Sequence, residues 1–133
     1  MITRVLVANR GEIARRVFAT CRRLGIGTVA VHTDPDAGAP HVGEADFRDG
    51  VSGYLDGAQL IAAAKAAGAD AVHPGYGFLS ENADFAAAVI DAGLTWIGPP
   101  VAAVRAMGSK IEAKKMMAAA GVPVLAELDP DTV

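Results

Sequence analysis

Short apolar runs alternate along the chain with stretches in which apolar residues recur at helical spacing. Four runs rich in aliphatic and β-branched residues predict buried strands: residues 4–8, 28–32, 71–72 and 94–97. Helical spacing predicts helices over four further stretches: residues 12–24, 57–67, 81–92 and 101–107. Strands that alternate with helices indicate an α/β fold, Rossmann-like, with a mostly parallel sheet and helices on both faces.

The first predicted helix has one apolar face, formed by Ile13, Val17, Cys21 and Leu24. Cys21 lies within this stripe, so we interpret it as a small core residue rather than a reactive thiol. Four arginines lie off the stripe and predict a solvated face: Arg15, Arg16, Arg22 and Arg23.

Residues 43–53 are weakly patterned and predict at most a short strand near Phe47. Asp56 follows them and is suited to cap the helix that carries Leu60, because its carboxylate can accept a hydrogen bond from a backbone N–H one turn in. We therefore expect that helix to begin directly after Asp56.

The first strand leads into Asn9-Arg10-Gly11, which could be mistaken for a dinucleotide site because Asp34 follows at about the distance of a ribose-binding acid. The turn has one glycine where the fingerprint requires G-x-G-x-x-G, so NAD or FAD binding is not expected. Asn9, Arg10 and Glu12 are polar at the carboxyl end of a strand. From the residues alone, a structural turn and a functional site are equally supported.

The stretch His73–Asn82, HPGYGFLSEN, reads as a strand end, a loop and a helix start. Pro74 cannot donate to a sheet ladder, so the strand should stop there. Gly75 and Gly77 permit backbone angles that other residues resist, and they hold Tyr76 between them. Ser80 is a candidate helix N-cap. The loop should present an aromatic ring at the carboxyl edge of the sheet, where ligands bind in open parallel sheets. From the residues alone, a turn whose ring is packed is equally supported.

Ser109-Lys110-Ile111-Glu112 matches the capping box S-x-x-E and predicts a helix that runs to about Ala120. Lys110 falls in its first turn, where free N–H groups and a lysine together suit a phosphate, but the residues alone favour a solvated lysine. Residues 123–133 are polar and acidic and predict a linker. The expected organisation is one domain over residues 1–122 followed by that linker.

Composition narrows the function classes. The net charge of −3 gives no support for nucleic-acid binding, and no apolar run approaches the length of a membrane span. One cysteine excludes an internal disulfide and fits a reducing, cytoplasmic compartment. The three histidines lie too far apart in sequence for a local metal motif, so no metal ligand is predicted.

Four motifs together resemble the biotin carboxylase component of biotin-dependent carboxylases, of the acyl-CoA carboxylase α subunit type. They are VANRGEIA at residues 7–14, VAVH at 29–32, HPGYGFLSEN at 73–82 and MGSK at 107–110. The resemblance covers nearly the whole chain and concerns only the first, pre-ATP-grasp domain of that enzyme. The chain departs from the family in residues 46–54, which form a shorter link than usual, and Gly53 stands where a serine is common.

The resemblance implies an ATP-dependent ligase. Mg-ATP (or Mn-ATP) and bicarbonate give carboxyphosphate and ADP, and the carboxyl group then moves to biotin on a carrier domain. In the family the lysine matching Lys110 reaches the ATP phosphates, and the loop with Tyr76 and Gly77 borders the biotin side of the cleft. The phosphate lid, metal-binding glutamates and catalytic arginine of the family lie beyond Val133, so the resemblance predicts no catalytic residue in this chain. The fragment is expected to be inactive alone and to bind no cofactor stably.

The implied partners are downstream ATP-grasp domains, a biotin carboxyl carrier domain, a carboxyltransferase subunit and a second copy of the enzyme, since the first helix takes part in dimerisation in many family members. The implied pathway is fatty acid metabolism through acetyl- or propionyl-CoA carboxylation. Two alternatives stay open. One is pyruvate carboxylase or another ATP-grasp ligase, which would differ in downstream domains. The other is a stand-alone flavodoxin-like binding module.

Overall fold

The structure is a computed structural model and describes residues 1–108 and residue 114. A five-stranded sheet with the order β3-β2-β1-β4-β5 forms its centre. The strands are β1 (Arg4–Val7), β2 (Gly27–His32), β3 (Phe47–Gly50), β4 (Ala71–His73) and β5 (Thr95–Trp96). Every strand pair is parallel, which confirms the predicted α/β class.

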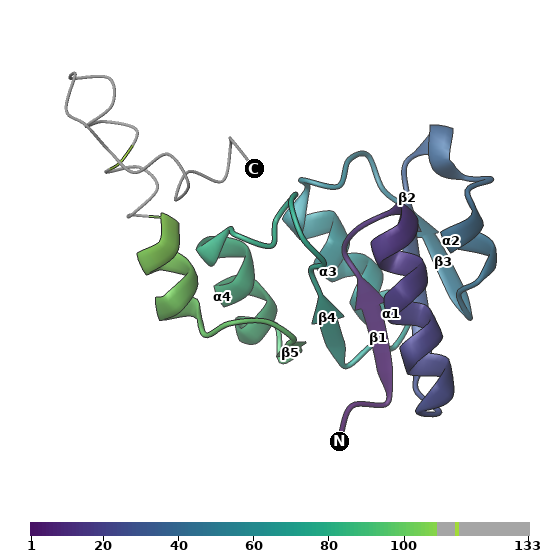
Figure 1. Cartoon of the computed structure of the whole chain (residues 1–133), viewed down its shortest axis with the longest axis horizontal. Coiled ribbons are helices and arrows are strands. Elements are labelled where there is room, and N and C mark those ends of the chain that lie inside the picture. Colours follow the sequence, from purple (N-terminus) through teal and green to yellow (C-terminus); the bar gives the residue numbers. More distant parts are fainter. Residues whose placement is uncertain (109–113, 115–133) are drawn as a thin grey trace.

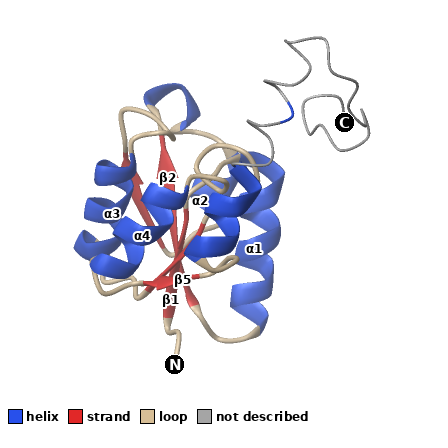
Figure 2. Cartoon of the chain, turned by 90° about the vertical axis from the view of Figure 1, so that its left-hand side faces the viewer, coloured by secondary structure: helices blue, strands red, loops and turns tan. Residues whose placement is uncertain are grey.

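Helices cover both faces of the sheet (Figures 1 and 2). One face packs against α1 (Gly11–Arg23), and the opposite face packs against α3 (Gly57–Ala66) and α4 (Ala83–Asp91). The short helices η1 (Asp34–Asp36) and α2 (Pro40–Gly43) follow β2, and a further helix spans residues 101–108. Strand side chains alternate between the two cores because successive residues point to opposite faces.

The buried line of α1 differs from the predicted stripe. Ala14, Phe18 and Cys21 are buried, whereas Leu24, expected in the stripe, is 68% exposed. Leu24 is the C-cap residue of α1, so it lies past the part of the helix that faces the sheet. Cys21 is a core residue as predicted, and burial raises the pKa of its thiol.

The predicted strand near Phe47 is confirmed as β3, and it pairs with β2 although it lies within the shortened link of residues 46–54. All four of its residues are exposed, as expected for an edge strand. The guanidinium of Arg4 lies 4.2 Å from the centroid of the Phe47 ring. Arg4 reaches across β2 at Gly27, where an added Cβ would lie 3.3 Å from the Arg4 Nε atom.

Two helix starts test the capping predictions. The Asp56 carboxylate accepts a hydrogen bond from the Gln59 N–H at 3.2 Å, as predicted for α3. The predicted cap at Ser80 is wrong, because α4 begins at Ala83 and not at Glu81. The N-cap is Asn82, which accepts a hydrogen bond from the Phe85 N–H at 2.9 Å. The backbone N–H of Ser80 instead closes a turn on Gly77 O, which keeps residues 77–80 in the loop.

Several predictions fall outside the described residues. They are the capping box at Ser109–Glu112, the helix to Ala120, the position of Lys110, the domain boundary at residue 122 and the linker 123–133. Among residues 1–108 and 114, no helix has the length and apolar character needed to cross a membrane. Within the same residues, no group of three His, Cys, Asp or Glu side chains gathers in a way that could hold a metal ion.

Candidate functional site

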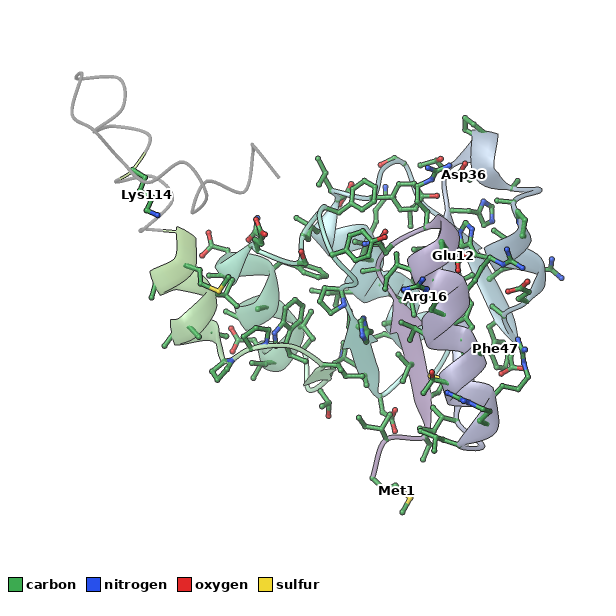
Figure 3. All side chains as sticks on the ribbon, in the orientation of Figure 1. Met1, Glu12, Arg16, Asp36, Phe47 and Lys114 are labelled. Atoms are coloured by element: carbon green, nitrogen blue, oxygen red, sulfur yellow. The ribbon has the colours of Figure 1, made fainter. Side chains whose placement is uncertain are left out.

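The parallel strands place their carboxyl ends at one edge of the sheet, where the turn after β1 meets the loop after β4. Val7 and His73 are register partners, and the Ala8 N–H donates to His73 O at 2.9 Å. Asp36, which follows β2, lies at the end of the molecule opposite Met1 (Figure 3). Segments distant in sequence therefore converge at this edge.

The loop after β4 presents two aromatic side chains to solvent. Tyr76 is 67% exposed and Phe78 is 45% exposed. Gly75 and Gly77 have φ values of 67° and 68°, in the left-handed region that glycine adopts most readily. The sequence prediction of a sharp turn with an exposed Tyr76 ring is met.

Asn9 connects the turn after β1 to this loop. Its side-chain Nδ2 donates to Pro74 O at 3.1 Å and to Tyr76 O at 2.7 Å. Its Oδ1 accepts from the Arg10 N–H at 2.8 Å, so each polar atom of the amide has a partner. Asn9 is 3% exposed, which makes these hydrogen bonds costly to lose.

Gly75 allows the loop to approach Asn9 closely. A Cβ added at Gly75 would lie 2.5 Å from Asn9 Nδ2, whereas one added at Gly77 would meet nothing within 4 Å. The two glycines therefore have different roles: both permit a positive φ, and only Gly75 also leaves room for the asparagine amide.

His73 supports the start of the loop. Its Nδ1 accepts a hydrogen bond from the Gly75 N–H at 3.0 Å, which requires an unprotonated Nδ1. Burial lowers the pKa of the imidazole by disfavouring its charged form. The ring is thus held neutral as a backbone acceptor.

An ion pair lies beside the loop at the same edge. The Arg10 guanidinium donates to both carboxylate oxygens of Asp36, at 2.6 and 2.8 Å, and the Tyr54 hydroxyl donates to Asp36 Oδ2 at 2.5 Å. Chiefly through the hydrogen bond from Arg10, these donors lower the pKa of Asp36 to about 2. Burial and the neighbouring carboxylate raise the pKa of the Tyr54 hydroxyl. Asp36 is therefore ionised at neutral pH and fixes both partners.

The structure brings together some predicted site residues and adds others. Tyr76 and Gly77 lie at the carboxyl edge as expected, while Lys110 is outside the described residues. The links that Asn9 and Asp36 make were not predicted. The position of Asn9, a polar residue directly after a buried strand, was a partial indication in the sequence. Nothing in the sequence pattern indicated that Asp36 pairs with Tyr54, 18 residues away.

Comparison with known proteins identifies the family. The family model "Biotin carboxylase, N-terminal domain" matches residues 1–104. The α subunit of methylcrotonoyl-CoA carboxylase from Glycine max is 54% identical over 130 residues, covering 93% of this chain and 18% of that protein. Pyruvate carboxylase from Mus musculus is 53% identical over 135 residues, covering 96% of this chain and 12% of that protein.

Solved structures agree with the sequence comparison. The biotin carboxylase domain of a thermophilic 2-oxoglutarate carboxylase, solved with bicarbonate bound, superposes with a TM-score of 0.81 at 43% identity. The match covers 94% of this chain and 29% of that one. The chain thus spans less than a third of each of these relatives. It belongs to the biotin carboxylase N-terminal domain family.

Proposed function

We propose that this chain is the amino-terminal domain of an ATP-dependent biotin carboxylase that supplies an acyl-CoA carboxylase. In the proposed reaction, Mg-ATP and bicarbonate give carboxyphosphate and ADP, and the carboxyl group moves to biotin on a carrier domain. The observation that carries the proposal is the family match over residues 1–104, combined with an exposed Tyr76 on a glycine-flanked loop at the carboxyl edge of the sheet.

The loop suits one side of a biotin site. An exposed phenol ring offers a flat apolar surface for a small heterocycle. Tyr76 O is turned inward to Asn9, and in a planar trans peptide the following N–H points in the direction opposite to the C=O. The Gly77 N–H therefore points away from Asn9, where it can donate to a ureido oxygen. Tyr76 and Gly77 are the residues that we propose to contact biotin.

The part of the chain that the structure describes does not fit a catalytic metal. Its residues contain no cluster of three acidic, histidine or cysteine side chains suited to a cation. We therefore assign no step of phosphoryl transfer to them. Lys110, by its place in a helix-start motif, is the residue of this chain that we propose to contact an ATP phosphate.

We propose that α1 and its surroundings form an interface in the full-length enzyme, as a homodimer contact or against downstream domains. A groove of about 360 Å³ lies between α1 and the β4–β5 side of the sheet, lined mainly by apolar residues that include Val17, Leu24 and Ile97. Beside it, the arginines predicted as a solvated face are exposed, and Arg15 pairs with Glu44 at 2.9 Å. An apolar groove bordered by charges is typical of a protein interface.

The remaining partners that we propose are a biotin carboxyl carrier domain and a carboxyltransferase subunit. We also propose a cytoplasmic location, which is consistent with a single buried cysteine. Pyruvate is a second candidate acceptor beside acetyl- or propionyl-CoA. The 53% identity to pyruvate carboxylase nearly equals the 54% identity to the acyl-CoA carboxylase relative, so both acceptors belong in the test.

The test is ADP release by the full-length polypeptide that carries this domain, with Mg-ATP and bicarbonate, in the presence and absence of free biotin. Biotin-dependent ADP release is expected, and the 133-residue chain alone should show none. ADP release that biotin does not stimulate would contradict the proposal. Adding the carrier and carboxyltransferase components with acetyl-CoA, propionyl-CoA or pyruvate then identifies the acceptor.

A further inference from the structure

The side chain of Asn9 contacts three backbone positions, and two of them belong to the loop proposed to bind biotin. Pro74 O and Tyr76 O both accept from Nδ2, across sequence separations of 65 and 67 residues. Pro74 O lies in the Pro74–Gly75 peptide and Tyr76 O in the Tyr76–Gly77 peptide, so the asparagine fixes both of these peptide planes. We infer that Asn9 is a positioning residue that sets the orientation of Tyr76 and Gly77 toward biotin.

The geometry leaves little freedom at this contact. Asn9 is almost wholly buried, and its Oδ1 is held by the Arg10 N–H at 2.8 Å, which orients the amide so that Nδ2 faces the loop. The absence of a side chain at Gly75 admits the amide, since a Cβ there would lie 2.5 Å from Nδ2. Asn9 and Gly75 therefore form one matched contact between the β1 turn and the β4 loop.

The chemistry requires an amide at this position. The two N–H groups of Nδ2 donate to two backbone carbonyl oxygens, and Oδ1 of the same side chain accepts from a backbone N–H. Asparagine supplies this set at this length, and aspartate cannot, because an ionised carboxylate only accepts. An aspartate would place a negative charge against two carbonyl oxygens and release the loop.

The consequence for binding follows from the peptide plane between Tyr76 and Gly77. While Tyr76 O is held by Asn9, the Gly77 N–H points away from Asn9. Without the clamp this peptide can rotate, because φ at Gly77 is unrestricted by a side chain. A preorganised donor binds its ligand without an ordering cost, so loss of the clamp should weaken biotin binding selectively.

This inference rests on the proposed function, and its test uses the full-length enzyme. Asn9→Asp keeps the size of the side chain and the oxygen facing Arg10 but removes the donor. The expected result is a Michaelis constant for biotin at least tenfold higher, with the constant for ATP changed less than twofold. Asn9→Ala, which removes the donor without adding charge, should show the same selectivity if the aspartate variant folds poorly.

Asn82→Asp is the matched control, because the Asn82 side chain accepts a hydrogen bond from the Phe85 N–H and an aspartate oxygen can accept it equally well. It should leave both Michaelis constants within twofold of wild type. Unchanged biotin kinetics in both Asn9 variants, or an equal rise in the two constants, would overturn the positioning role.

Amide hydrogen exchange of the segment 73–82 in the same proteins gives a readout that does not depend on the reaction. In the wild type the Gly75 N–H is held by His73, and exchange across the segment should accelerate at least tenfold in the Asn9 variants and not in Asn82→Asp. If the wild-type enzyme shows no biotin-dependent ADP release, the proposed function fails. Amide exchange that is unchanged in the Asn9 variants would refute the positioning role of Asn9, whatever the enzyme's activity.

Discussion

The ring of Tyr54 packs against the ring of Phe78, with centroids 5.3 Å apart and planes inclined by 40°. Phe78 has a φ of 44°, and it is the one non-glycine residue with a positive φ among residues 1–108 and 114. Such a conformation costs about 1–3 kcal/mol and persists where the surroundings hold it. Tyr54 also binds Asp36 through its hydroxyl, so the contact joins the strained loop to the Arg10–Asp36 pair.

Tyr54→Phe should lower the thermal stability while keeping the ring contact with Phe78. It removes the hydrogen bonds of the hydroxyl to Asp36 and to the Thr33 N–H, and one such bond contributes about 1 kcal/mol. That corresponds to a fall in Tm of roughly 3–6 °C for a domain of this size. Tyr76→Phe is the control, since the exposed ring should lose less than about 1 °C. Equal melting of the two variants would show that the Tyr54 hydroxyl contributes nothing.

The Arg10–Asp36 pair should make stability depend on pH in the acid range. The pKa of Asp36 is lowered from 3.8 to about 2, so the unfolded state binds a proton more readily than the folded state. The stabilisation is complete above about pH 4 and is lost as the pH falls toward 2. The difference in Tm between wild type and Asp36→Asn should therefore shrink between pH 5 and pH 2. In an Arg10→Gln background that difference should be much smaller at every pH, and an undiminished difference would mean that Arg10 is not the cause.

Gly75→Ala and Gly77→Ala separate backbone strain from close approach. Both place an alanine at a φ near +68°, which costs roughly 1–2 kcal/mol. Only the Gly75 variant also forces a Cβ to within 2.5 Å of Asn9 Nδ2. Gly75→Ala should therefore melt several degrees below Gly77→Ala in parallel thermal scans. The reverse order would show that the Asn9 contact is not tight in solution.

Tyr76→Ala should raise the Michaelis constant for biotin in the full-length enzyme more than the constant for ATP. The side chain is 67% exposed, so its removal should change the Tm by less than about 2 °C. Steady-state kinetics paired with thermal melting checks both parts. A large fall in Tm with unchanged biotin kinetics would make Tyr76 a packing residue.

Lys110→Gln should mainly weaken ATP binding in the full-length enzyme. The substitution removes a charge while Ser109 can still cap the predicted helix. A charge-assisted contact contributes about 1.5–3 kcal/mol, which corresponds to a tenfold to hundredfold rise in the constant for ATP. Nucleotide titration of the wild type and the variant measures this directly. Unchanged ATP affinity with normal turnover would return Lys110 to a solvated role.

The sequence by itself determined the class of fold and the local shape of the loop. Alternating aliphatic runs and helical spacing were sufficient for the parallel sheet, because strand and helix periodicities are local properties of the chain. Gly75 and Gly77 predicted a sharp turn for the same reason, and Asp56 was found as a cap because an N-cap bonds within one turn of its own helix.

The tertiary structure decided which side chains meet. The burial of Phe18 rather than Leu24 depends on where α1 crosses the sheet, and Asn82 replaces Ser80 as the cap because residues 77–80 form turns instead of helix. The clamp from Asn9 to Tyr76 exists because the register of β1 and β4 brings Val7 beside His73. Hydrogen bonds across more than sixty residues depend on that register, and no local pattern in the sequence encodes it.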